Sequence, residues 1–485
     1  MLLKFLNKIS KRKLALLKYL ENAVSLTETK EFLVAKLGMS NFLLTKTVQE
    51  LNIDFYQIGL NEEFKIYSDR ETIKLIVTNE SGLIASEALL THYLDHSLKF
   101  SLLKECFFEQ LSSLYEFATN HYLSHTPVYK EFRKFKLILK EYGIQVNKKF
   151  HLVADEGDLR AFIFSFFIKD YYISQFLFPV EIIEKQKSFS HFYDKSWLNS
   201  QQSIVKWNRL NLYLWIMITR IQNDHFIQKK TLSNIVTSKQ LSVIEEIKLW
   251  LLEISPKASE ECIAHEVYAL LGFLVVDGWL VDNQQYIDKE QSYIKQLNAN
   301  FLTAIQKKFT LSSEIMMLLC TEITTIHYEL LSFSVGVREE YQNLNISYFS
   351  DAYPEFTAFC NNHLKENYNS YVLRNNRDFL FFRYLVLLIS IIPLKEITEA
   401  FYICVDFSFG SSYNQMIQKK INKMLDLNIK YQNFPNDNTH LILSNLPFYE
   451  EHLTDHILWV TPPEIIDWIK FTEKVAGIRR KRTNV

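Results

Sequence analysis

Glycine and proline are scarce in this sequence, at 10 and 9 of 485 residues. Folds with many tight turns, such as β-propellers and large β-sandwiches, need these residues, so the shortage argues against such folds. It also argues against glycine-rich phosphate loops, and neither GxGxxG nor GxxxxGK[ST] occurs. Phenylalanine and tyrosine are abundant, at 37 and 26 residues. The composition therefore predicts long helices with bulky apolar cores.

Cysteine is also sparse, and its five positions lie far apart: Cys106, Cys262, Cys320, Cys360 and Cys404. No pair has the spacing of a zinc site or a disulfide framework, so we predict no metal, no cofactor and a reducing environment. The most hydrophobic run, residues 384–392, is about half as long as a membrane span. No signal-peptide pattern opens the sequence. We therefore expect a cytoplasmic protein without a membrane segment.

The chain has no overall excess of positive or negative charge, since the formal net charge is -1. The charged residues are nevertheless unevenly distributed along the sequence. Residues 126–150 contain seven lysines and arginines against Glu131 and Glu141, and residues 1–18 contain six basic residues and no acid. Such runs are typical of polyanion sites, although a solvated helix face has the same composition.

The chain length predicts about three to five domains.

A first winged helix-turn-helix is predicted over residues 1–70. A helix over 9–23 precedes a capping-box pattern at Ser25, and a second helix ends at Gly38. Ser40 can cap a third helix over 41–51, and the alternation in 55–67 predicts a β-hairpin wing. The third helix would enter the major groove. Its predicted DNA-contacting residues are Ser40, Asn41, Thr45, Lys46 and Gln49.

A second winged helix-turn-helix is predicted over residues 71–164. Ser113 opens a capping box, and Thr126 is the predicted N-cap of a helix whose Val128, Phe132, Phe135 and Leu139 form one apolar stripe. Alternating runs on both sides of residues 147–149 predict a second wing. The predicted DNA contacts are Thr126, Tyr129, Lys130, Arg133, Lys134, Lys136, Lys148 and Lys149. Other helical bundles can share one such pattern, but two in tandem favour DNA binding.

Long helical runs fill residues 165–395, with a candidate boundary at 282–285 that divides them into segments 165–285 and 286–395. Residues 396–485 change character and alternate strand and helix patterns, which predicts a small α/β domain. The loop Gly410-Ser411-Ser412 between strand and helix can hold phosphate through its backbone N–H groups or form an ordinary turn. The predicted fold class is thus mainly α and multidomain.

The order of these parts resembles the Mga/AtxA family of bacterial transcription regulators. The segments that carry the resemblance are SLTETKEFLVAKLGMSNFLLTKTVQELN (25–52), SLYEFATNHYLSHTPVYKEFRKFKLILKEYGI (113–144), ADEGDLRAF (154–162), ITTIHYEL (323–330) and RDFLFFRYLVLL (377–388). The resemblance implies a non-enzymatic activator of virulence genes that binds double-stranded DNA as a homodimer or higher oligomer. It also implies five domains: two winged domains, two helical phosphotransferase-regulation domains and a tail similar to the IIB component of sugar phosphotransferase systems.

In such a family, histidines of the helical domains accept phosphoryl groups from sugar-uptake phosphocarriers. Two histidines here fall on predicted helical runs, and His327 is the first candidate and His225 the second. IIB components carry a phosphorylated cysteine at the end of the first strand, where this chain has Val405, with Cys404 one residue early. We therefore expect the tail to serve docking or dimerisation. Two alternatives are a IIB-like phosphocarrier and an RNA antiterminator, which shares the histidine-bearing helical domains but begins with an all-β RNA-binding domain.

Overall fold

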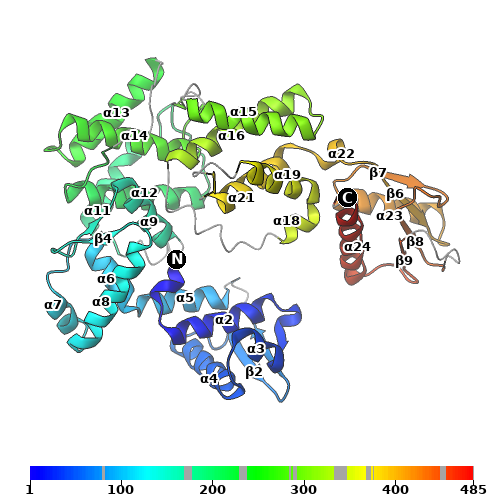
Figure 1. Ribbon diagram of the computed structural model, residues 1–485, viewed down its shortest axis with the longest axis horizontal. Coiled ribbons are helices and arrows are strands. Elements are labelled where there is room, and N and C mark those ends of the chain that lie inside the picture. Colours follow the sequence, from blue (N-terminus) through cyan, green and yellow to red (C-terminus); the bar gives the residue numbers. More distant parts are fainter. Residues whose placement is uncertain are drawn as a thin grey trace. The chain divides into compact units, whose positions relative to one another are not determined.

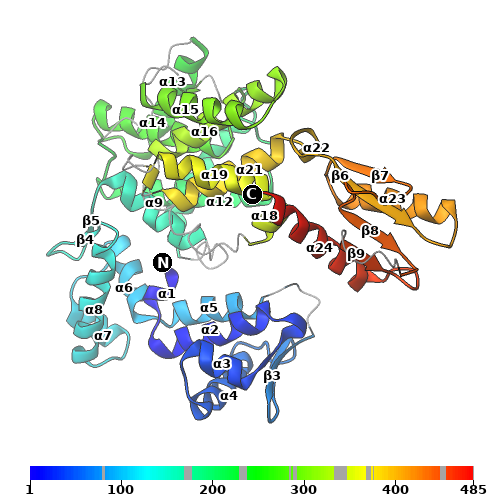
Figure 2. The same ribbon diagram turned by 45° about the vertical axis from the view of Figure 1, so that its right-hand side comes forward.

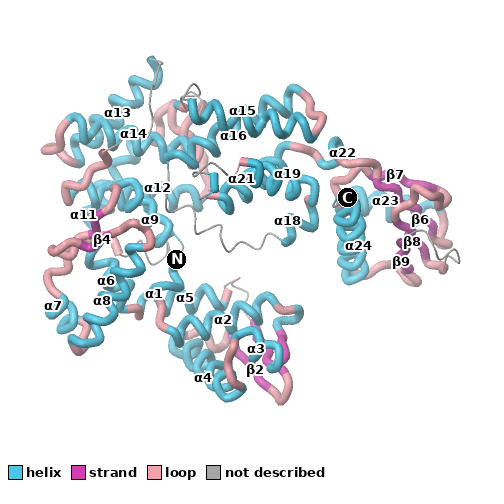
Figure 3. Tube along the Cα trace, viewed as in Figure 1, coloured by secondary structure: helices cyan, strands magenta, loops and turns pink. Residues whose placement is uncertain are grey.

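The computed structural model describes residues 1–78, 82, 84–168, 177–228, 238–282, 286–287, 292–332, 347–367, 373–374, 376–447 and 455–483 (Figure 1). Helices make up most of this part of the chain, and the strands lie in two N-terminal winged elements and in the tail (Figure 3). The mainly α, multidomain fold class is confirmed. The chain forms two compact units: Met1–Phe189 with Ser203–Gln228, and Ser190–Gln202 with Lys229–Val485.

The first winged element follows the order helix, strand, helix, helix and hairpin. Its parts are α1 (Leu2–Phe5), α2 (Lys8–Asn22), η1 (Val24–Leu26), β1 (Thr27–Thr29), α3 (Lys30–Leu37), α4 (Asn41–Gln57), β2 (Phe64–Ser68) and β3 (Thr72–Val77). The strands form an antiparallel sheet in the order β1-β3-β2. Gly38 has the left-handed conformation that ends α3, and the Ser40 hydroxyl accepts a hydrogen bond from the Leu43 N–H, as predicted.

Two details of the first prediction are wrong. Ser25 does not cap a helix, because its φ is 59°, and α3 begins at Lys30 after Thr29, whose hydroxyl accepts from the Phe32 N–H. The wing does not occupy 55–67, since Phe55 is a fully buried residue of α4. Phe55 continues the apolar stripe of α4, so the helix gains core contacts by extending to Gln57. The sheet consequently reaches Val77, beyond the predicted boundary at residue 70.

The second winged element lies between the helix pair α5–α6 and the helix α9 along the chain. Its neighbourhood comprises α5 (Ala85–Asp95), α6 (Leu98–Phe107), α7 (Leu114–Asn120), α8 (His125–Lys140), β4 (Gln145–Val146), β5 (Leu152–Val153) and α9 (Glu156–Phe167). Ser113 caps α7 by accepting from the Glu116 N–H, and β4 and β5 form the predicted wing. The Thr126 N-cap prediction is wrong: α8 begins at His125 after Ser124. Pro127 still lies in the first turn, where a missing N–H costs no helical hydrogen bond.

Substitutions at Ser40 and Thr126 test where α4 and α8 begin. Ser40→Ala removes the side-chain acceptor at the start of α4 and should destabilise this helix by about 1 kcal/mol, whereas Ser40→Gly should cost only a few tenths. Hydrogen exchange of the α4 amides should accelerate about fivefold in Ser40→Ala. Thr126→Ala is the matched control and should leave exchange in α8 unchanged, because Thr126 lies inside the helix. Faster exchange in the control would restore Thr126 as the cap.

An aromatic core joins α1 to the second winged element. The Phe5 ring lies 4.6 Å from that of Phe166 and 6.3 Å from that of Phe135, and Phe100 stacks on Phe166 at 5.5 Å. The same unit continues with α11 (Val180–Lys187), η3 (Ser188–Phe192), part of which belongs to the other unit, and α12 (Ile204–Gln222), which packs against α9. The segment predicted as one helical domain over 165–285 therefore contributes to both units.

The second unit combines a helical bundle with the α/β tail. Its helices are α13 (Ser238–Ile254), α14 (Glu260–Val276), α15 (Ser292–Lys308), α16 (Ser313–Ser332), α18 (Ser347–Ala352), α19 (Pro354–Glu366), α21 (Arg377–Ile391) and α22 (Leu394–Ile397). Helices α15, α16, α19 and α21 enclose one apolar core. The predicted boundary at 282–285 falls mostly on 283–285, which lie outside the described residues.

The tail is a small α/β domain, as the sequence predicts, and its sheet is parallel (Figure 2). It contains β6 (Phe401–Asp406), α23 (Ser411–Met424), β7 (Ile429–Gln432), β8 (Leu441–Ser444), β9 (Asp455–Leu458) and α24 (Ile465–Thr483). The strand order is β7-β6-β8-β9, with every pair parallel. Ile403 and Val405 share one apolar core with α23 and α24. Cys404 is buried but points to the opposite face, because side chains alternate along a strand.

Candidate nucleic-acid interface

Helix α8 has one buried face and one basic exposed face. Its buried residues are the four of the predicted stripe, Val128, Phe132, Phe135 and Leu139. The exposed residues include all six predicted on this helix: Thr126, Tyr129, Lys130, Arg133, Lys134 and Lys136. An amphipathic helix that follows a short turn can present such a face to a DNA groove and its phosphates.

The basic residues of α8 differ in how strongly they are paired. Lys134 Nζ lies 2.5 Å from Glu131 Oε1, which partly neutralises its charge, and Lys136 lies over the Phe132 ring at 5.2 Å. Within the described part of the chain, Lys130 and Arg133 form no ion pair. These two side chains are therefore the best placed to exchange counterions for DNA phosphates.

The wing tip beside α8 is ordered by an asparagine. The Asn147 Oδ1 atom accepts hydrogen bonds from the backbone N–H groups of Lys149 at 2.8 Å and His151 at 3.0 Å. Lys148 and Lys149 are exposed at this tip. The turn thus holds two predicted phosphate contacts on a short, defined hairpin.

Helix α4 also gathers its predicted contacts on its exposed side. Ser40, Asn41, Thr45, Lys46 and Gln49 are all exposed. Lys46 lies 3.9 Å from Glu50, and the exposed aromatic Phe42 lies among them, 79% accessible. Phe42 is not among the contacts predicted from the sequence. Its position outside the apolar stripe of α4 was the signal that could have indicated its exposure. The arrangement is polar and weakly charged, unlike the face of α8.

The basic residues in the run 1–18 are more extensively ion-paired than those of α8. Arg12 Nη2 lies 2.8 Å from Glu50, and the buried Lys13 Nζ lies 2.6 Å from Asp54. Lys4 is paired with Glu141 at 2.8 Å. Half of the six basic residues in this run therefore form ion pairs within their own unit, which makes the run a weaker polyanion site than the α8 face.

The two candidate histidines lie in opposite environments. His327 of α16 is fully buried. Its Nδ1 lies 2.6 Å from Asn298 Oδ1, and its Nε2 lies 2.8 Å from the Tyr384 hydroxyl. Because the asparagine oxygen accepts, Nδ1 donates and Nε2 accepts from the tyrosine. Burial lowers the pKa of His327 to about 3, so the ring is neutral at physiological pH.

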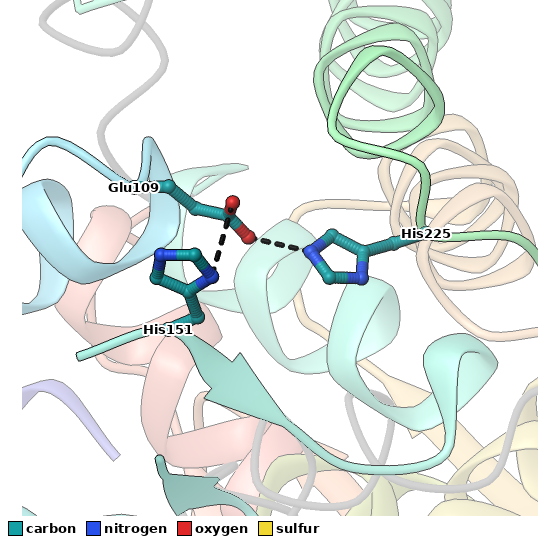
Figure 4. A group of neighbouring side chains, drawn as sticks. All are labelled: Glu109, His151 and His225. Carbon is teal, nitrogen blue, oxygen red and sulfur yellow. Dashed lines mark hydrogen bonds and ion pairs between the residues drawn. The ribbon is translucent and has the colours of Figure 1, made fainter. Parts of the chain in front are cut away.

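His225 lies just beyond the end of α12 rather than on a helix, contrary to the sequence prediction. Its ring is 30% exposed, and Nε2 lies 2.5 Å from Glu109 Oε1 (Figure 4). The second oxygen of Glu109 lies 3.2 Å from Nδ1 of His151. The sequence indicated neither Glu109 nor His151, because they lie far from His225 along the chain and in no local pattern.

In the tail, the loop after β6 is closed by side-chain hydrogen bonds. The Ser408 N–H donates to Asn445 Oδ1 at 2.9 Å, and Asn445 Nδ2 donates to Ser408 Oγ at 2.7 Å. Burial raises the pKa of the Cys404 thiol to about 11, and nearby Asp406 adds to this effect. A buried thiol that stays protonated is a poor phosphoryl acceptor.

Comparison with known proteins identifies one domain. Residues 84–167 match the Mga helix-turn-helix domain, and this segment contains α7, α8 and the β4–β5 wing. No curated protein matches the chain. None of the described helices is both long enough and apolar enough to cross a membrane.

Proposed function

We propose that this chain, whose residues 84–167 match the Mga helix-turn-helix domain, is a transcription activator that binds double-stranded DNA through α8 and its wing. The supporting observation is that Lys130 and Arg133 are exposed and unpaired on the face of α8 opposite its buried stripe. The α4 face would contribute a second, less charged contact. The role is regulatory and not enzymatic.

An electrophoretic mobility assay tests this function. The full-length protein should shift duplex DNA at lower concentration than single- or double-stranded RNA of the same sequence. The reverse preference would favour the RNA antiterminator. Binding measured over a range of salt concentrations separates phosphate contacts, which weaken with salt, from a non-electrostatic association.

We also propose that sugar phosphotransferase status regulates the protein through His225. Its ring is partly exposed, whereas both ring nitrogens of His327 are buried and hydrogen-bonded. Transfer to a ring nitrogen requires that the phosphocarrier reach it. His225 is therefore a better acceptor than His327 in this fold.

Incubation with phosphoenolpyruvate and the general phosphocarrier proteins should label His225 and not His327. His225→Gln should reduce the phosphohistidine signal in mass spectrometry to background. His121→Gln is the matched control, because His121 is also a partly exposed histidine beside a glutamate, Glu105, at 3.1 Å. Label on His327 would contradict the accessibility argument and require the bundle to open.

The tail is proposed as a docking or dimerisation domain rather than a phosphocarrier. Val405 and not cysteine stands at the end of β6 on the core face, and Cys404 is buried on the other. A homodimer formed partly through this domain should appear in light scattering as twice the chain mass. A monomer at micromolar concentration would contradict the assembly.

A further inference from the structure

Three side chains that are distant in the sequence converge in the N-terminal unit. Glu109 follows α6, His151 follows the wing tip, and His225 follows α12. One ligand atom from each residue lies within 4.8 Å of the other two. Figure 4 shows the carboxylate of Glu109 facing both imidazoles. Two imidazole nitrogens and one carboxylate form a common protein ligand set for first-row divalent metals.

The backbone is unusual at Glu109 and directly before each of the two histidines. Glu109 has a φ of 58°, and the residues before the two histidines, Phe150 and Asp224, have φ of 64° and 60°. The described part of the chain has only seven non-glycine residues with positive φ, and three of these seven are Glu109 and the residues directly before the two histidines. Such conformations cost free energy and are concentrated at functional sites. At Glu109 glycine would relieve the strain, but it would remove the carboxylate.

A buried arginine next to the cluster has an unsatisfied donor. Arg220 is almost fully buried, and its Nε and Nη2 donate to Glu156 at 3.0 and 2.9 Å. Its Nη1 lies 3.7 Å from Glu109 Oε1, too far for a hydrogen bond, and has no other partner. A water or hydroxide bound to an ion at this cluster would accept from Nη1. An oxygen ligand held there would satisfy this buried donor.

We propose that Glu109, His151 and His225 bind a divalent transition-metal ion of the zinc type, with a water molecule completing a tetrahedral site. Two imidazoles and one carboxylate suit Zn²⁺ better than Mg²⁺ or Ca²⁺, which prefer oxygen ligands. The ion ties His151, directly after the basic wing tip, to the end of α12. It thereby fixes the hairpin that carries Lys148 and Lys149.

The metal site does not depend on the proposed DNA binding and is measured without DNA. An ion on Nε2 of His225 would exclude a phosphoryl group from the same atom. Acid should weaken metal binding, because protons compete with the metal for the imidazole nitrogens. Ion pairs between protonated histidines and Glu109 are the alternative without a metal.

Chelator-treated full-length protein should bind one Co²⁺ per chain with the visible spectrum of a nitrogen- and oxygen-ligated ion, and Zn²⁺ should displace it. His151→Gln and His225→Gln should each weaken Zn²⁺ binding at least about tenfold in competition with a chromophoric chelator. Glu109→Gly should do the same while relieving the backbone strain, which separates loss of the ligand from misfolding. His121→Gln should bind like the wild type.

Wild-type affinity in all three ligand variants, or thiolate-to-cobalt charge-transfer bands, would overturn the site. Zn²⁺ should also slow hydrogen exchange at the β5 amides of Leu152 and Val153 in the wild type and not in His225→Gln. If Zn²⁺ binds without slowing this exchange, the ion does not hold the wing, and the structural role is wrong.

Discussion

Replacing both Lys130 and Arg133 by alanine should weaken binding to every duplex DNA by a similar factor. Each phosphate contact contributes about 0.9 to the slope of log affinity against log salt, so two lost contacts should lower that slope by about two units. Near 0.1 M salt the affinity should fall on the order of fiftyfold to one hundredfold. Both side chains are exposed on α8 and lack an ion-pair partner among the described residues.

Two controls separate a DNA contact from general loss of charge. Lys134→Ala should have a smaller effect, because Lys134 is already paired with Glu131 at 2.5 Å. Lys187→Ala removes an exposed charge from α11, outside the matched domain, and should leave the salt slope unchanged. An unchanged slope in the double variant would remove α8 from the DNA interface. A loss confined to one DNA sequence would instead assign these residues to base recognition.

The α8 face was predictable because its pattern is local. Four apolar residues at helical spacing define the buried side, and the basic residues then fall on the other side without further information. The wing after Gly143 was predictable for the same reason, since two short alternating runs surround a polar turn. The tail strands followed from short apolar runs separated by polar loops.

The errors occurred where two local signals compete. Phe55 fits both a strand run and the continuing stripe of α4, and burial in the core favours the helix. Ser25 has a good capping pattern, but β1 pairs with β3 at Thr27–Thr29 and delays the helix to Lys30. Strand pairing across more than 40 residues leaves no trace at the capping position.

The tertiary partners of charged and polar residues could not be predicted. Nothing near Lys13 in the sequence indicates Asp54, and nothing near His327 indicates that Asn298 and Tyr384 occupy both ring nitrogens. The convergence of Glu109 with two histidines depends on three loop ends that only the packed unit brings together. Sequence patterns therefore identified the exposed basic surface but not the residues that modulate it.

A buried ion-pair cluster joins the matched domain to α12. Glu156, the first residue of α9, lies 2.9 Å from Arg160 Nε and accepts from Arg220 at 2.9 Å. All three side chains are at most 9% exposed. Burial alone would raise the pKa of Glu156, but attraction by Arg160 and the hydrogen bond from Arg220 outweigh it, so the pKa is lowered. The carboxylate is thus ionised and compensates two buried guanidinium groups.

Glu156→Gln should destabilise the contact of α9 with α12 by about 3–5 kcal/mol, because it leaves buried positive charge without compensation. Hydrogen exchange of the α9 amides should accelerate about a hundredfold or more. Because the folded pKa is depressed, the wild-type contribution is present above the pKa of an unfolded glutamate and is lost as pH falls through the lower folded pKa. The Glu156→Gln variant should lack this loss of stability in acid.

As a control, Glu141→Gln, at the exposed pair with Lys4, should change stability by at most about 1 kcal/mol. Combining Glu156→Gln with Arg220→Met should cost less than the sum of the single changes, since the uncompensated charge is removed with its partner. Additive effects would show that the three residues pack side by side without sharing their charge.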